Sequence, residues 1–146
     1  MKAPFNVFVI PYFVNKDNTV DYTIFKRSDE GYWQFIAGGG EDNESAMQAA
    51  KRESFEEAGI SSESEYLDLN FKEMLRVEDV RGYLWGPDVT KIPNHGFAVQ
   101  VKTKQIILSH EHTEYKWVNC DEALNMLKWD GNKKALKLFN DDLISK

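Results

Sequence analysis

The amino-acid sequence predicts an α/β protein of the α+β kind, in which helices cover both faces of a mixed β-sheet. Two observations favour this fold class. Strand-like and helix-like segments follow one another without the strict alternation that is typical of a doubly wound parallel sheet. In addition, the chain has 146 residues, 42% of them hydrophobic, and contains no internal repeat or linker. Residues 1–146 are therefore expected to form one domain around a single core.

The first strands are marked by dense β-branched and aromatic residues. Phe5–Val14 and Thr19–Lys26 flank a polar turn and predict a β-hairpin. Tyr32–Ile36 predicts a short third strand, which we expect to end at the glycines 38–40.

A helical pattern follows these glycines and spans Glu44–Ala58. Asp42 or Asn43 can cap its N-terminus, and Gly59 stands where a helix commonly ends.

The second half of the chain is expected to contain further short strands and two helices. Hydrophobic patterning predicts strands at Leu67–Val77, Gly96–Val101, Gln105–Leu108 and Tyr115–Val118, a loop over Arg81–Asn94, and helices over Asp121–Leu127 and from Lys133 to about Phe139.

Charge and cysteine content exclude several classes of protein. Eighteen Lys and Arg residues against 24 Asp and Glu residues give a net charge of −6, which argues against binding to a nucleic-acid polymer. A phosphorylated substrate would need bound cations or a local basic site. Cys120 is the single cysteine, so a disulfide scaffold or a cysteine-rich zinc site is excluded and a reducing compartment is expected. We find no signal peptide and no apolar run near the ~20 residues that span a bilayer. We expect a cytoplasmic monomer or homodimer without a membrane partner.

The predicted helix over Glu44–Ala58 carries an unusual face. Six of its positions are linked by steps of three and four residues: Ala46, Ala49, Ala50, Glu53, Glu56 and Glu57. Three carboxylates at the C-terminal end of a helix repel one another and oppose the macrodipole. Arg52 can reach Glu56, but one guanidinium cannot neutralise three carboxylates. Mg²⁺ or Mn²⁺ could, because both prefer oxygen ligands. The alternative is an ordinary solvated Glu/Lys face.

Eight positions within residues 38–60 follow a defined spacing: Gly38, Glu44, Arg52, Glu53, Glu56, Glu57, Gly59 and Ile60. This spacing resembles the signature box of the Nudix hydrolases. One position departs from the box, because Ser54 stands where a bulky aliphatic residue is usual. The preceding segment Trp33–Ile36 also looks like the family, although Ala37 stands where proline is frequent.

The resemblance implies the Nudix fold, a mixed sheet between helices with a loop–helix–loop box. It also implies metal-dependent hydrolysis of a nucleoside diphosphate linked to another moiety, with a small phosphorylated molecule as the partner. By the resemblance Glu53, Glu56 and Glu57 are metal ligands and Arg52 orients a glutamate. Gly38, with Gly39 beside it, would bring the backbone close to metal and phosphate.

A second acidic candidate lies in Leu108–Trp117. In several Nudix branches a loop glutamate followed by histidine and a Tyr-X-Trp strand binds metal or acts as the general base. The resemblance assigns this role to Glu111, with Glu114 as the alternative, and a solvated loop acid is the plainer interpretation. His110 and His112 could suggest zinc, but no cysteine partners accompany them.

The substrate depends on residues outside the box. Two branches resemble Leu108–Trp117: the diadenosine tetraphosphate hydrolases and the bacterial dihydroneopterin triphosphate diphosphatases, a group also associated with dATP. The segment Lys128–Leu136 and the Trp33-Gln34 pair look more like the latter. This implies cleavage of a triphosphate to monophosphate and diphosphate, the dinucleoside polyphosphate reaction being the alternative. A Nudix-fold binding or regulatory module without catalysis is a third hypothesis, which the intact box glutamates disfavour.

A flat heterocycle needs aromatic stacking and a polar group that reads its edge. Gln34 could read an edge, and four aromatic residues could stack, although a place in the core is the plainer interpretation for each: Trp33, Phe35, Tyr83 and Trp85. Lys26 and Arg27 point to opposite faces of one strand, so we expect at most one of them to meet phosphate.

Overall fold

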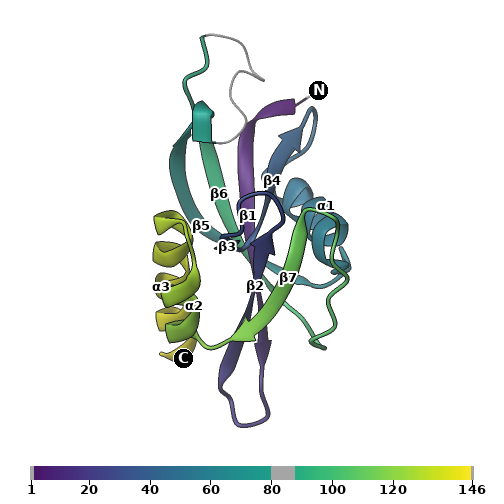
Figure 1. Cartoon of the computed structure of the whole chain (residues 1–146), viewed down its shortest axis with the longest axis vertical. Helices are drawn as coiled ribbons and strands as arrows, with labels where there is room; N and C mark the ends of the chain where they lie inside the picture. Colours follow the sequence, from purple (N-terminus) through teal and green to yellow (C-terminus); the bar gives the residue numbers. More distant parts are fainter. Residues whose placement is uncertain (1, 80–87, 146) are drawn as a thin grey trace.

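The computed structural model describes residues 2–79 and 88–145. This part of the chain forms a seven-stranded sheet, three α-helices and one 3₁₀ turn (Figure 1). The strands are β1 (Lys2–Val14), β2 (Val20–Arg27), β3 (Trp33–Gln34), β4 (Ile36–Glu41), β5 (Glu65–Arg76), β6 (Lys91–Gln100) and β7 (His112–Val118). The helices are α1 (Ala46–Ala58), α2 (Cys120–Met126) and α3 (Asp130–Ile144), and the 3₁₀ turn is η1 (Val77–Asp79).

The sheet is mixed and is organised around β1. This strand pairs antiparallel with β4 between Lys2 and Val9, parallel with β6 between Asn6 and Tyr12, and its last three residues form the hairpin with β2. β5 pairs with the outer edge of β6, while β3 and β7 both pair with β2. A mixed sheet between helices is the predicted fold class, which the structure confirms.

Alternate residues of β1 enter two separate hydrophobic clusters, because successive side chains of a strand point to opposite faces. Val7 and Val9 pack with the alanines of α1, including Ala49. Phe8 and Ile10 pack on the other face, with residues of α2 and α3. Figure 1 shows α1 on one side of the sheet and α2 and α3 on the other.

The ends of α1 fix its position next to the glycines of β4. Ser45, not Asp42 or Asn43, caps the N-terminus, and its side chain accepts a hydrogen bond from the backbone N–H of Gln48. Gln48 returns a hydrogen bond to the backbone N–H of Ser45, which completes a capping box. Gly59 ends the helix with φ of 71°, as predicted, in the left-handed region that favours glycine.

Three predicted segments differ from the structure. The glycines 38–40 do not end a strand but belong to β4, because their backbone pairs with β1. Gln105–Leu108 is not a strand; the backbone N–H of Ile107 instead donates to the carbonyl of Ala58 at the end of α1. β6 begins at Lys91, inside the predicted loop. Pro93 is tolerated there because only β5 pairs with β6 before Asn94, so one strand edge is unpaired.

The helices of the second half start earlier than predicted. α2 is capped by Asn119, whose side chain accepts from the backbone N–H of Glu122. α3 begins at Asp130 and is 15 residues long. Among the described residues, no helix is both long enough and apolar enough to cross a membrane.

Candidate active site

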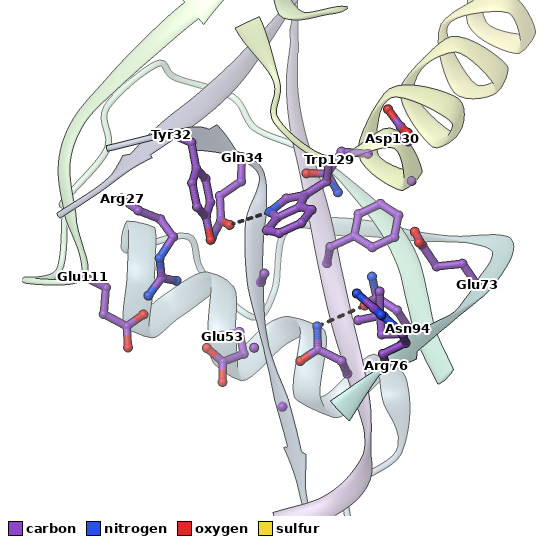
Figure 2. Close-up of a pocket in the computed structure, with 18 of the residues that line it drawn as sticks. Arg27, Tyr32, Gln34, Glu53, Glu73, Arg76, Asn94, Glu111, Trp129 and Asp130 are labelled. Atoms are coloured by element: carbon purple, nitrogen blue, oxygen red, sulfur yellow. Dashed lines mark hydrogen bonds between the residues drawn. The ribbon is translucent and has the colours of Figure 1, made fainter. Parts of the chain in front are cut away.

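A cavity of about 600 Å³ opens between α1 and the start of α3 (Figure 2). Its wall combines side chains from many elements of the fold. The charged and polar ones used below are Arg27, Gln34, Arg52, Glu53, Glu56, Glu73, Glu111, Trp129 and Asp130.

Arg52 organises the carboxylates at one end of this cavity. Its Nε and Nη2 donate to the two carboxylate oxygens of Glu44 at 2.7 and 3.0 Å. Its Nη1 donates to Glu53 at 2.9 Å and to Glu56 at 3.2 Å, and Nη2 also donates to the carbonyl of Gly39 at 2.9 Å. One guanidinium therefore joins β4 to three glutamates, and the bidentate pair with Glu44 fixes its plane.

Glu53 lies directly against the backbone of β4. A Cβ atom at Gly38 would overlap the Glu53 carboxyl group, so only glycine permits this approach. Glu53 is buried yet lines the cavity, and its carboxylate receives the hydrogen bond from Arg52. The close packing of Gly38 on Glu53 holds the carboxylate at the cavity wall.

Glu57 is the most deeply buried of the box glutamates, with 2% of its surface exposed. Neither of its carboxylate oxygens has a hydrogen-bond partner among the described residues. Burial, and then the adjacent carboxylate of Glu53, raise the pKa of Glu57 well above its ordinary value. A buried carboxylate without a hydrogen-bonding partner is costly, so the site favours a cation at this position.

His112 is the nearest basic side chain to Glu57, with its Nε2 3.8 Å from Oε1 of Glu57. This distance is too long for a hydrogen bond. Burial, and then the positive charge of Arg27, lower the pKa of His112 to about 4. The imidazole is therefore neutral near pH 7 and does not neutralise Glu57.

Glu111 and Glu114 take different positions. Glu111 precedes β7, is half-buried and lines the cavity together with Glu53. Its carbonyl accepts hydrogen bonds from the backbone and the hydroxyl of Ser28, which hold its loop against the loop that follows β2. Glu114 is exposed on β7, does not line this cavity, and pairs with Lys26 at 3.8 Å.

The donor set suits a hard divalent cation. Glu53, Glu56, Glu57 and Glu111 offer carboxylate oxygens, the ligands that Mg²⁺ and Mn²⁺ prefer, and both Glu57 oxygens lack hydrogen bonds. In the described ranges, no three acidic, histidine or cysteine side chains are already gathered closely enough to hold an ion. Glu56 and Glu111 are the more exposed of the four.

The opposite part of the cavity wall is aromatic and amide-rich. The indole N–H of Trp129 donates to Oε1 of Gln34 at 3.3 Å, and the rings of Trp129 and Tyr32 meet edge to face at 5.3 Å. Gln34 is 4% exposed, and its Nε2 has no hydrogen-bond partner among the described residues. These groups can hold a flat ring and offer it a hydrogen-bond donor.

The remaining predicted substrate residues are divided. Arg27 lines the cavity, with its Nε and Nη2 each donating to Asp29 at 2.9 Å, whereas Lys26 does not. Trp33 and Phe35 pack in the cluster beneath α2 and α3 and do not line the cavity. Gly38 and Gly39 line it next to Arg52. Tyr83 and Trp85 lie outside the described residues.

Sequence reasoning missed several cavity residues. Glu73 comes from the middle of β5, and Asn6 and Asn94 form a buried hydrogen bond of 3.1 Å between β1 and β6. Trp129 belongs to the segment Lys128–Leu136, which resembles the family, but no pattern marked it as a cavity residue. An asparagine inside the hydrophobic run of β1 was a signal for Asn6, whereas no local pattern marked Glu73.

Comparison with known proteins identifies the family of this chain. A family model described as the NUDIX domain matches residues 6–139. The dihydroneopterin triphosphate diphosphatase of Haemophilus influenzae is 30% identical over 140 residues, which cover 92% of this chain and 87% of that protein.

Two solved structures are similar over nearly the whole chain. A NUDIX hydrolase from Listeria monocytogenes superimposes with a TM-score of 0.87 at 32% identity, covering 98% of this chain and 96% of that one. The dihydroneopterin triphosphate pyrophosphohydrolase of E. coli has a TM-score of 0.80 at 25% identity, covering 99% of this chain and 98% of that one.

Proposed function

This chain belongs to the Nudix hydrolase family, and on that premise we propose that it cleaves a pterin or deoxynucleoside triphosphate, of the dihydroneopterin triphosphate or dATP type, to monophosphate and diphosphate. The observation that carries the proposal is the position of Glu53, Glu56 and Glu111 at one end of a cavity whose opposite wall is aromatic. The similarity to dihydroneopterin triphosphate diphosphatases supports the triphosphate as substrate class.

Nudix hydrolases generally use divalent metal ions, and here Glu53, Glu56, Glu57 and Glu111 would hold Mg²⁺ or Mn²⁺. When bound, the ions would neutralise the triphosphate and lower the pKa of an attacking water.

The side chains of this protein then supply positioning and proton transfer. Arg52 holds Glu53 and Glu44 in fixed orientations through three hydrogen bonds. Glu111 accepts the proton of the attacking water on a carboxylate oxygen, since it is a half-buried carboxylate that lines the cavity and is not engaged by Arg52. Arg27, also at the cavity wall, contributes a positive charge for the transferred phosphates. No covalent intermediate is required.

A product assay tests this proposal. The protein is incubated with Mg²⁺ and, separately, with dihydroneopterin triphosphate, each dNTP, diadenosine tetraphosphate and ADP-ribose, and products are separated by ion-exchange chromatography. We expect monophosphate and diphosphate in equal amounts from a triphosphate, and no turnover when EDTA is present.

Three outcomes would contradict the proposal. Cleavage of diadenosine tetraphosphate alone would establish the dinucleoside polyphosphate reaction instead. If no compound is hydrolysed although nucleotides bind, the protein is a binding module. Full turnover in EDTA would refute the metal-dependent mechanism.

A further inference from the structure

Glu73 is a cavity carboxylate that the proposed mechanism does not use. It extends from β5 into the cavity, and Figure 2 shows it on the far side of the site from Glu53 and Glu111. A Cβ atom at Gly131, in the first turn of α3, would overlap the Glu73 carboxyl group, so this carboxylate packs directly on the helix backbone. Glu73 is therefore held in place at a distance from the catalytic end.

Hydrogen-bond donors from a ligand would stabilise the Glu73 carboxylate. Burial raises its pKa above the ordinary value; the charge of Lys134 opposes this shift, and Asp130 adds to it. No hydrogen bond or ion pair joins the Glu73 carboxylate to another described residue. A half-buried carboxylate of this kind gains most from a ligand that donates two hydrogen bonds from one edge.

The side chain of Gln34 gives independent evidence that this part of the cavity binds a polar ring. An indole N–H can only donate, so the hydrogen bond from Trp129 requires the amide oxygen of Gln34 to face the indole. The amide nitrogen is thereby left as a donor, buried at the cavity wall and without a protein partner in the described part of the chain. A ligand acceptor would satisfy it.

We propose that Glu73 is a specificity-determining residue that accepts hydrogen bonds from the adjacent N–H and NH₂ groups of a 2-amino-4-oxo heterocycle, the donor edge that pterin and guanine share. This inference rests on the proposed function and narrows it. Adenine has one amino group beside a ring acceptor, so it cannot donate twice to one carboxylate. Trp129 supplies the aromatic surface, and Gln34 donates to an acceptor of the ring.

The test removes the hydrogen bond between the 2-amino group and Glu73 in two ways, by changing the ligand and by changing the protein. GTP and ITP differ only in the 2-amino group, and kcat/KM for both is measured with Mg²⁺ for the parent and for Glu73→Gln. The parent should favour GTP over ITP by about ten- to a hundredfold, the ratio expected for a hydrogen bond to a charged group. Glu73→Gln should abolish most of this preference by lowering kcat/KM for GTP much more than for ITP, which keeps the ring N–H but has no 2-amino group to lose its partner.

A matched control is Glu65→Gln, the same change at the exposed first residue of β5 and outside this cavity. It should keep the parental preference. A purely structural role of Glu73 at the start of α3 would lower the Tm and the turnover of both nucleotides equally, and that result would overturn the proposal. So would a parent enzyme that does not distinguish GTP from ITP.

Failure of the proposed function gives a separate signal, namely no hydrolysis of any triphosphate by the parent. In that case saturation-transfer NMR with guanosine and inosine tests the recognition site alone, because neither ligand needs a metal or a triphosphate. Stronger binding of guanosine to the parent, lost in Glu73→Gln, would support the inference, and equal binding of the two nucleosides would overturn it.

Discussion

The two ends of the cavity differ in their charge and in their hydrogen bonds. At the box end, the guanidinium of Arg52 donates hydrogen bonds to three glutamates, Glu44, Glu53 and Glu56. At the other end, a tryptophan and an amide form a single neutral hydrogen bond next to Glu73. The box end has more negative charge than its arginine can compensate, whereas the other end has unused hydrogen-bonding capacity on the amide nitrogen of Gln34 and the carboxylate of Glu73.

This difference indicates a division of labour. Excess negative charge is useful where cations and phosphates meet, because the cations then complete the neutralisation. Unused hydrogen bonds on a rigid aromatic wall are useful where a ring must be distinguished from its analogues. We therefore expect substitutions at the box end to lower kcat for every substrate. Substitutions at the other end, which we call the ring end and which contains Gln34, Glu73 and Trp129, should change KM for particular substrates.

The largest effect is expected from Glu57→Gln. A carboxylate ligand would be lost, and since metal ions contribute several kcal/mol to catalysis, kcat should fall by about 10⁴ or more. Steady-state kinetics with Mg²⁺ on two triphosphates measure the change, which should be equal for both. Parental activity in this variant would show that Glu57 does not bind the metal.

The same variant should be more stable than the parent in EDTA, because an amide replaces a buried carboxylate without hydrogen bonds. Burial raises the pKa of Glu57 in the folded protein, so its contribution to stability is present below the unfolded value near 4.5 and is lost as the pH rises through the folded pKa. The advantage of Glu57→Gln should thus grow with pH, to about 1–3 kcal/mol at pH 8 by urea unfolding.

His112 contributes to the pH dependence of stability with the opposite sign. Its pKa is lowered to about 4 in the folded state from an ordinary 6.5, so its contribution is present above pH 6.5 and is lost as the pH falls towards 4. The difference between parent and variant is therefore compared above pH 6.5, where His112 is neutral in both the folded and the unfolded protein. A difference that does not change with pH would contradict the assigned cause.

Glu111→Gln should lower kcat by about 10²–10⁴, the range for a lost general base, with a smaller change in KM. Glu114→Gln is the matched control, because Glu114 is exposed and pairs only loosely with Lys26. The acidic limb of the pH–rate profile should also flatten in the first variant where chemistry limits the rate. A damaging Glu114→Gln beside a silent Glu111→Gln would place the base on β7 instead.

The box end was largely predictable from sequence, because its chemistry lies on one helix. Steps of three and four residues placed Glu53, Glu56 and Glu57 together, and the spacing to Gly38 resembled a known box. The predicted cap was wrong because Asp42, Asn43 and Ser45 are all good capping residues, and only the hydrogen bonds of the folded helix choose among them.

The ring end could not be predicted in the same way. Gln34, Glu73 and Trp129 lie on β3, β5 and the start of α3, and only the order of strands in the sheet brings them to one cavity. Glu73 stands in an alternating strand, where a charged residue normally faces solvent. The two-residue period tells which face it shares with its neighbours, but not that α3 begins above that face.

Arg52→Lys should have an intermediate effect, about ten- to a hundredfold on kcat, as is common for groups that orient metal ligands. Lysine retains the charge but cannot make the bidentate pair with Glu44 while donating to Glu53. The activity should be partly restored by raising Mn²⁺ or Mg²⁺, since the ligands remain. A loss that no metal concentration restores would indicate that Arg52 contacts the substrate instead.

The smallest effect is expected from Trp129→Phe, at the ring end. Phenylalanine keeps an aromatic face but removes the N–H that fixes the amide of Gln34, so Gln34 can turn and present either its oxygen or its nitrogen to the ring. KM for dihydroneopterin triphosphate or GTP should rise up to about tenfold, since one neutral hydrogen bond contributes about 0.5–1.5 kcal/mol. The value of kcat should stay within about twofold, because the glutamates around Arg52 are untouched. Inorganic triphosphate, which has no ring, is the control substrate, and its kinetics should not change. A fall in kcat for inorganic triphosphate would mean that the two ends of the cavity are coupled and that the division of labour is incomplete.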